Sequence, residues 1–145
     1  MDVPLRRVAD QPTWLLSQAH ARASRILQAA FADAGFRGYQ YRLMAALEQY
    51  GASSQADLSR RTGIDRKDVV HALNDLEKRG LVSRTPDRAD ARRNVVALTE
   101  AGGAELVRLD GIVAGVQDEV LAPLTVAERR QLRQLLGKLG TAATD

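Results

Sequence analysis

Cysteine is absent from the 145-residue sequence, and aromatic residues make up only 4% of it. The absence of cysteine excludes disulfide bonds, thiolate metal ligands and a cysteine redox switch, and it is compatible with a reducing compartment. No apolar run approaches the ~18 residues of a membrane span, and the first residues lack the apolar stretch of a signal peptide. We therefore expect a soluble protein of the cytoplasm.

Motifs for catalysis, metal binding and cofactor binding are missing as well. The two histidines, His20 and His71, are far apart and have no cluster of carboxylates nearby, so no metal-ligand spacing occurs. The sequence also has no glycine-rich phosphate loop, no nucleophile elbow and no HExxH motif. We expect no catalytic residue, no metal and no cofactor, and we predict a binding protein that is not an enzyme.

The aromatic residues all lie at or before Tyr50, whereas the basic residues gather in the middle of the chain. Residues 37–93 carry twelve Lys and Arg against eight Asp and Glu, although the net charge of the whole chain is only +3. A basic segment favours a polyanionic partner, and a basic face that is merely solvated is the alternative. Single-stranded nucleic acid usually stacks on aromatic rings, which this segment nearly lacks, so duplex DNA is the favoured partner.

Hydrophobic periodicity and capping signals predict an α+β chain that is predominantly α, with the element order ααααββαα. The elements, in chain order, are helices at about 13–34, 38–49, 54–63 and 65–80, a β-hairpin at 81–98, and one helix on either side of Pro123. Helix starts are expected where a side chain can accept a hydrogen bond from a backbone N–H group, at Thr13, Ser54, Asp65 and Thr125.

The third and fourth helices have the spacing of a helix-turn-helix unit. Leu58, Ile64 and Val69 are spaced to form its small apolar core, and Gly63 permits a positive φ in the turn. Ser59 has to be small because the second helix of the unit crosses over it. A structural pair of helices would share this pattern, but the basic hairpin that follows favours a winged helix-turn-helix that binds DNA.

With Val69, Leu73 and Leu76 facing inward, the opposite side of the fourth helix is polar and cationic. In helix-turn-helix proteins this helix enters the major groove, and base contacts concentrate toward its N-terminal half. The hairpin tip adds long cations that reach phosphates or a narrow minor groove. Asp90 is spaced to orient the Arg92 guanidinium, and a simple turn-forming role for Asp90 is the alternative. The predicted DNA-binding residues are Ser54, Arg66, Lys67, Val70, His71, Asn74, Lys78, Arg88, Asp90, Arg92 and Arg93.

The end segments carry more apolar side chains than one small DNA-binding core can cover. One apolar stripe runs through 106–120 at the spacing of a seam between helices, and another runs through 132–139. We therefore predict a homodimer in which 1–36 and 100–145 are dimerisation helices. Residues 37–99 are predicted to form the winged helix-turn-helix, and the whole chain to form a single compact domain.

The segment GLVSRTPDRADARRNVVALTEAG at 80–102 resembles the wing signature of the MarR-type transcriptional regulators. Asp90 and Arg92 match the Asp-x-Arg of the wing tip, and LTEAG at 98–102 matches the LT-x-x-G end. The segment GIDRKDVVHALNDLEKRG is similar to the recognition helix of the family, although many members carry Thr-Arg where this chain has Val-His. The resemblance extends over about 13–139.

The resemblance implies a homodimer that binds double-stranded DNA at a near-palindromic operator, commonly as a repressor. Members often release DNA when a small ligand, frequently aromatic or anionic, enters a cleft between the dimer and DNA-binding regions. Members that sense oxidants do so through cysteine, which this chain lacks. The candidate ligand-binding residues are Trp14, His20, Tyr39, Tyr41 and Arg42, for which packing or solvation is the alternative role.

A second hypothesis about function is a winged-helix protein without a sensor. Such a protein binds DNA architecturally or docks a protein partner, and the fold alone does not separate these uses. High affinity for one palindromic site over random duplex would favour the regulator.

Overall fold

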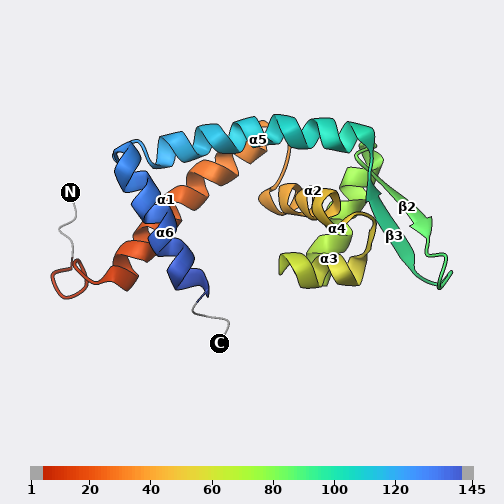
Figure 1. Ribbon diagram of the computed structural model, residues 1–145, viewed down its shortest axis with the longest axis horizontal. Helices are drawn as coiled ribbons and strands as arrows, with labels where there is room; N and C mark the ends of the chain where they lie inside the picture. The colour runs from red at the N-terminus through yellow and green to blue at the C-terminus, as the bar shows by residue number, and fades with distance from the viewer. Residues whose placement is uncertain (1–4, 142–145) are drawn as a thin grey trace. The chain divides into compact units, whose positions relative to one another are not determined.

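In the computed structural model, residues 5–141 are described, and they form six helices and three short strands (Figure 1). The elements are α1 (Pro12–Asp33), α2 (Gly38–Tyr50), β1 (Ser53–Ser54), α3 (Gln55–Thr62), α4 (Arg66–Lys78), β2 (Val82–Pro86), β3 (Asn94–Leu98), α5 (Glu100–Val120) and α6 (Val126–Thr141). The predicted α+β fold, predominantly α, is confirmed. The sequence pattern did not predict β1, because two residues are too few to show the period of a strand.

Two of the four expected helix starts are capped as predicted. The Ser54 hydroxyl accepts a hydrogen bond from the Asp57 backbone N–H at 3.1 Å, at the start of α3. Before α6, the Glu128 N–H donates to the Thr125 hydroxyl at 3.2 Å, and the Thr125 N–H donates to the Glu128 carboxylate at 2.9 Å. These bonds satisfy N–H groups that have no partner inside the helix.

Of the other two expected helix starts, the one at Thr13 is shifted by one residue, and the one at Asp65 is placed as predicted but lacks the side-chain hydrogen bond. Helix α1 begins at Pro12, one residue before the predicted cap Thr13, because a proline in the first turn needs no partner for an N–H group. Asp65 does precede α4, but among the described residues its side chain makes no capping hydrogen bond to the helix.

The elements fall into two compact units, which are described separately. One unit is Leu27–Val113, and the other combines 1–26 with 114–145. Helices α1 and α5 each contribute to both units.

Unit Leu27–Val113 contains a continuous apolar core. Its largest fully buried side chains come from α2, α3, α4 and α5 and from the hairpin; they are Leu43, Met44, Leu58, Leu73, Leu76, Leu109, Val69 and Val96. Leu106 also belongs to this core. The expectation that the whole 106–120 stripe is open to a second copy is therefore corrected, since its first turns are packed inside the chain.

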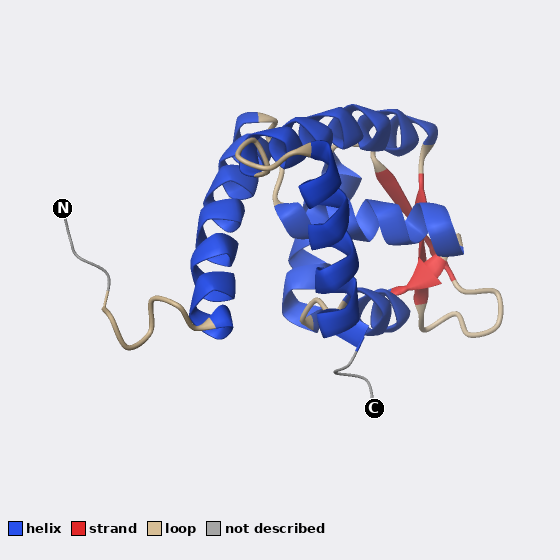
Figure 2. Ribbon diagram, turned by 60° about the vertical axis from the view of Figure 1, so that its left-hand side comes forward, coloured by secondary structure: helices blue, strands red, loops and turns tan. Residues whose placement is uncertain are grey.

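A small antiparallel sheet with the strand order β1-β3-β2 completes this unit (Figure 2). Strands β2 and β3 form the predicted hairpin, in which Val82 pairs with Leu98 and Arg84 pairs with Val96. Strand β1 pairs with the middle of β3, where Ser53 lies opposite Val96. The central strand β3 is thus fixed on both sides.

The base of the hairpin is fixed to the start of α5 around Thr99. Its N–H donates to the Leu81 carbonyl at 3.1 Å, and its hydroxyl donates to the Gly80 carbonyl at 2.7 Å. The same hydroxyl accepts from the Gly102 N–H at 3.0 Å. A β-carbon at Gly102 would collide with the Leu81 carbonyl oxygen and with the Leu98 side chain. These contacts explain the LT-x-x-G pattern in physical terms.

The unit formed by the two chain ends is helical. The Arg22 guanidinium donates to the Val120 carbonyl at 2.9 Å, and the Arg129 guanidinium pairs with Asp118 at 3.2 Å. Several large apolar side chains of this unit are more than a third exposed; they are Leu5, Trp14, Leu15, Leu16, Val126, Leu135, Leu136 and Leu139. Their exposure in a single chain is what a dimerisation surface requires, and dimerisation itself stays a prediction.

Candidate nucleic-acid interface

The helix-turn-helix predicted from the sequence is assembled from α3 and α4. Leu58, Ile64 and Val69 are buried together, and Gly63 adopts the left-handed conformation with φ of 71° in the turn. The Ser59 hydroxyl donates to the Ile64 carbonyl at 2.6 Å. A small side chain at this crossing therefore ties the two helices together, and α4 is held with one defined face outward.

Helix α4 has sharply different faces. Val69, Ala72, Leu73 and Leu76 are at most 1% exposed. Between them lies an exposed face of polar and basic side chains that includes one apolar residue, Val70, with 39% exposure. All the residues predicted to contact DNA from this helix are exposed; they are Arg66, Lys67, Val70, His71, Asn74 and Lys78.

The tip of the hairpin carries three exposed arginines, Arg88, Arg92 and Arg93. The Asp90 carboxylate accepts hydrogen bonds from the backbone N–H of Arg92 at 3.1 Å and from its guanidinium Nε at 3.3 Å. The Asp90–Arg92 contact suggested by the spacing is thus present, while 93% of the Arg92 side chain remains exposed. Its role toward DNA stays a prediction.

The sequence interpretation missed Arg84, which lies on β2 and contacts α4. Its guanidinium donates to the Asn74 side-chain oxygen at 2.8 Å and lies 3.8 Å from the Glu77 carboxylate. The alternation of side chains along β2 could have identified it, because Arg84 lies on the same face of the strand as the buried Val82.

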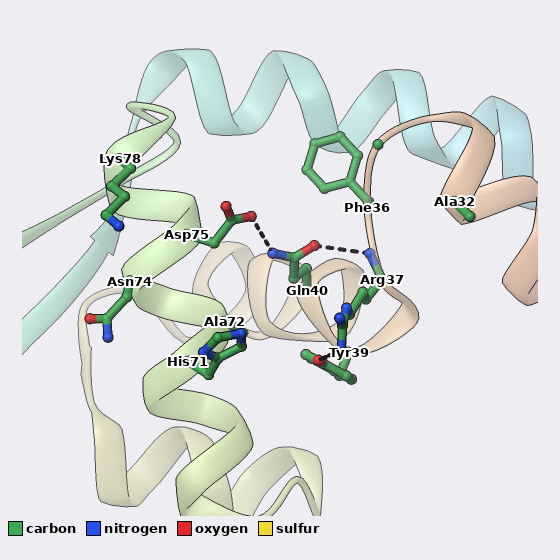
Figure 3. Close-up of a pocket in the computed structure, with 11 residues that line it drawn as sticks. Ala32, Phe36, Arg37, Tyr39, Gln40, His71, Ala72, Asn74, Asp75 and Lys78 are labelled. Carbon is green, nitrogen blue, oxygen red and sulfur yellow. Dashed lines mark hydrogen bonds between the residues drawn. The ribbon is translucent and has the colours of Figure 1, made fainter.

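A pocket of about 460 Å³ adjoins α4 (Figure 3). Gln40 lies at its centre and is 5% exposed. Its side-chain N–H donates to the Asp75 carboxylate at 2.7 Å, and its side-chain oxygen accepts from the Arg37 backbone N–H at 2.9 Å. The lining residues are Ala32, Gly35, Phe36, Arg37, Tyr39, Gln40, His71, Ala72, Asn74, Asp75 and Lys78.

The wall formed by the α1–α2 turn is braced against the end of α4. The Arg79 guanidinium lies 3.9 Å from the centre of the Phe36 ring and donates to the Gly35 carbonyl at 2.7 Å. On the α2 side, the Arg37 guanidinium donates to the Tyr39 hydroxyl at 2.9 Å. The pocket lining therefore includes the Tyr39 ring and the Arg37 guanidinium, next to the exposed face of α4.

Only part of the predicted ligand set lies at this pocket. Tyr39 lines it, whereas Tyr41 and Arg42 are not among the lining residues. Tyr41 donates to the Asp110 carboxylate at 2.5 Å, and this hydrogen bond, together with burial, raises the pKa of Tyr41 to about 12. Trp14 and His20 belong to the other unit, where His20 Nε2 lies 3.4 Å from the Ser24 hydroxyl.

Comparison with known proteins decides the family. A family model described as the MarR family matches residues 34–93. The HTH-type transcriptional repressor NicR of Pseudomonas putida is 31% identical over 132 residues, which cover 91% of this chain and 84% of NicR. The chain belongs to the MarR family. Members of this family are transcriptional regulators and not enzymes.

Two solved structures resemble this MarR-family chain closely. A probable transcriptional regulator from Pseudomonas aeruginosa is 33% identical with a TM-score of 0.77, and the match covers 90% of this chain and 97% of that protein. BpsR of Bordetella bronchiseptica, whose DNA binding is regulated by 6-hydroxynicotinic acid, is 28% identical with a TM-score of 0.78. That match covers 92% of this chain and 95% of BpsR.

The described residues offer neither a metal site nor a membrane-spanning helix. Within 5–141, no three His, Cys, Asp or Glu side chains are grouped so that they could hold a metal ion. In the same range, no helix is both long enough and apolar enough to cross a membrane.

Proposed function

We propose that this MarR-family chain is a homodimeric repressor that binds a near-palindromic operator in duplex DNA and is released by a small ligand. The observation that carries the DNA-binding part is the exposed polar and basic face of α4, held outward by the buried stripe opposite. In this proposal α4 enters the major groove. The exposed Arg88, Arg92 and Arg93 of the hairpin tip contact the adjacent minor groove.

The dimer part of the proposal is supported by the exposed apolar side chains of α1 and α6. Leu135 and Leu139 are 58% and 59% exposed, which is costly for a helix with no partner on that face. We assign dimerisation to 1–36 and 100–145, and DNA binding to 37–99. A two-fold dimer presents two recognition helices to two half-sites, which is why the operator is expected to be near-palindromic.

The ligand part of the proposal is supported by the pocket beside α4. Tyr39 offers an aromatic surface, and Arg37 together with His71 favours a carboxylate. BpsR, a relative of this chain, responds to an aromatic acid, 6-hydroxynicotinic acid. We therefore expect a small aromatic carboxylate, which would repel DNA phosphate and contact His71 and Asn74 on the face that binds DNA.

DNA binding is tested by measuring affinity for a selected operator and for a scrambled duplex. Lys67→Ala is expected to weaken operator binding about 5- to 150-fold if Lys67 reaches a base edge, with a smaller effect on scrambled duplex. Arg42→Ala is the matched control, because it removes the same charge from an exposed position on α2 that is not among the predicted DNA contacts. Equal affinity of the unmodified chain for both duplexes would refute the sequence-specific regulator and support the architectural alternative.

The ligand is tested with aromatic carboxylates, 6-hydroxynicotinic acid among them, by thermal melting and by displacement from the operator. Arg37→Gln is expected to abolish the response of an active compound. Arg42→Gln is the control, because it removes the same charge from a position in α2 outside the pocket lining. A response lost in Arg42→Gln and kept in Arg37→Gln would refute the pocket, and the absence of any active compound would refute ligand release.

A further inference from the structure

Arg84 occupies a strand position whose neighbours on the same face of the sheet are buried apolar side chains. Side chains of a strand alternate between its faces, so Arg84 shares its face with Val82, which is 2% exposed. Its cross-strand partner Val96 is completely buried. The Arg84 side chain is itself only 17% exposed.

The guanidinium of Arg84 is incompletely satisfied in this position. Its Nε and Nη2 atoms are buried and have no hydrogen-bond partner among the described residues. Burying a charged group with unpaired donors costs stability that an unbranched apolar side chain would not cost. A contribution to folding therefore does not account for this arginine.

The polar contacts of Arg84 within the described chain are both made by Nη1, and both lead to α4. Nη1 donates to the Asn74 Oδ1 atom at 2.8 Å and lies 3.8 Å from a Glu77 carboxylate oxygen. A guanidinium has only donors, so it can hold the amide of Asn74 only by its oxygen. The orientation of this amide is thus fixed, with its oxygen engaged by Arg84 and its two N–H donors left for another partner.

We propose that Arg84 is a specificity-determining positioning residue that turns the Asn74 amide so that its N–H donors face a base edge. This inference rests on the proposed function, in which α4 reads the major groove. A freely rotating asparagine pairs with adenine by accepting from N6 and donating to N7. An amide whose oxygen is turned toward Arg84 presents its NH2 group to the base instead, and this group favours guanine, because guanine presents two acceptors, O6 and N7, side by side. Guanine is therefore favoured over adenine at the base pair that Asn74 faces.

The test is selection of binding sites from a random duplex library with the full chain and its variants. Asn74→Ala identifies the base pair that this residue reads, because discrimination falls there and not elsewhere. Arg84→Met keeps an unbranched side chain of similar length and frees the amide to rotate. The ratio of guanine to adenine at that base pair is expected to fall about 10-fold, with preferences at the other positions unchanged. Arg84→Lys, which retains a donor, should restore part of the ratio.

Two controls separate positioning from folding and from charge. Arg84→Met removes unpaired buried donors, so its melting temperature should be no lower than that of the unmodified chain. Arg88→Met removes a cation from the exposed tip of the same hairpin, and it should weaken binding to all duplexes without changing the base preference.

The outcomes distinguish this inference from the function on which it rests. If the unmodified chain selects a motif but Arg84→Met keeps the original guanine-to-adenine ratio, the inference is overturned and the regulator stands. The same holds if Asn74→Ala weakens all duplexes equally, since Asn74 would then contact phosphate. If the unmodified chain selects no motif, the proposed function falls and this inference falls with it.

Discussion

Gly102 and Gly103, neighbours in α5, permit a matched test of the packing that fixes the hairpin. A β-carbon at Gly102 would collide with the Leu81 carbonyl, whereas a β-carbon at Gly103 would meet no atom within 4 Å. Both substitutions by alanine share a gain in helix propensity of up to about 1 kcal/mol. Only Gly102→Ala suffers overpacking against backbone, which costs about 1–3 kcal/mol. The difference between the two variants therefore isolates the collision.

The expected result is that Gly102→Ala melts about 2–12 °C below Gly103→Ala, since 1 kcal/mol corresponds to about 2–4 °C in a chain of this size. Gly103→Ala should melt at or above the unmodified chain. Thermal unfolding followed by circular dichroism at one fixed protein concentration measures both, because the concentration affects the melting of a dimer. Equal melting temperatures for the two variants would show that α5 can shift away from Leu81, and the close approach would then not fix the hairpin.

Three other features give predictions about assembly, alkaline stability and DNA binding. Leu139→Asp, at a side chain 59% exposed in a single chain, should convert the dimer to a folded monomer in light scattering; an unmodified chain that is already monomeric at micromolar concentration contradicts this. Because the pKa of Tyr41 is raised to about 12 by its hydrogen bond to Asp110, the stability from that bond should be lost as pH rises from about 10 to 12. Tyr41→Phe should flatten the unfolding free energy in that window, whereas an unchanged pH profile would refute the assignment. Arg92→Ala should weaken specific and scrambled duplex by similar factors and lower the salt slope by about one, without lowering the melting temperature, since 93% of the side chain is exposed. Asp90→Ala should partly reproduce this loss in the same salt titration, and tighter binding would show that the carboxylate only repels phosphate.

Local signals in the sequence predicted much of the fold. The caps at Ser54 and Thr125, the left-handed turn at Gly63 and the contact between Asp90 and Arg92 each join residues a few positions apart. At that range the spacing of residue types nearly determines the geometry. The helix-turn-helix core was predictable for the same reason.

Features that depend on partners distant in the sequence were not predictable in this way. The Gln40 and Asp75 side chains form a hydrogen bond although they lie 35 residues apart in the sequence. Nothing in either residue type predicts the other as its partner. The apolar stripe of α5 was visible, but periodicity does not tell which of its residues pack inside the chain, as Leu106 and Leu109 do. Arg84 was visible as an inward position, yet its partner Asn74 follows only from the packing of β2 beside α4.

The hydrogen bonds around Thr99 hold the hairpin at its base, and its tip projects from there. Its base is clamped to Gly80, Leu81 and the first turn of α5, while its tip is closed by a hydrogen bond from the Asp87 N–H to the Arg93 carbonyl within the turn itself. Loss of the Thr99 hydrogen bonds is therefore expected to reach the arginines of the tip through the two paired strands. Variants of Thr99 that contact no DNA should accordingly appear beside the arginine variants in an unbiased screen for loss of operator binding.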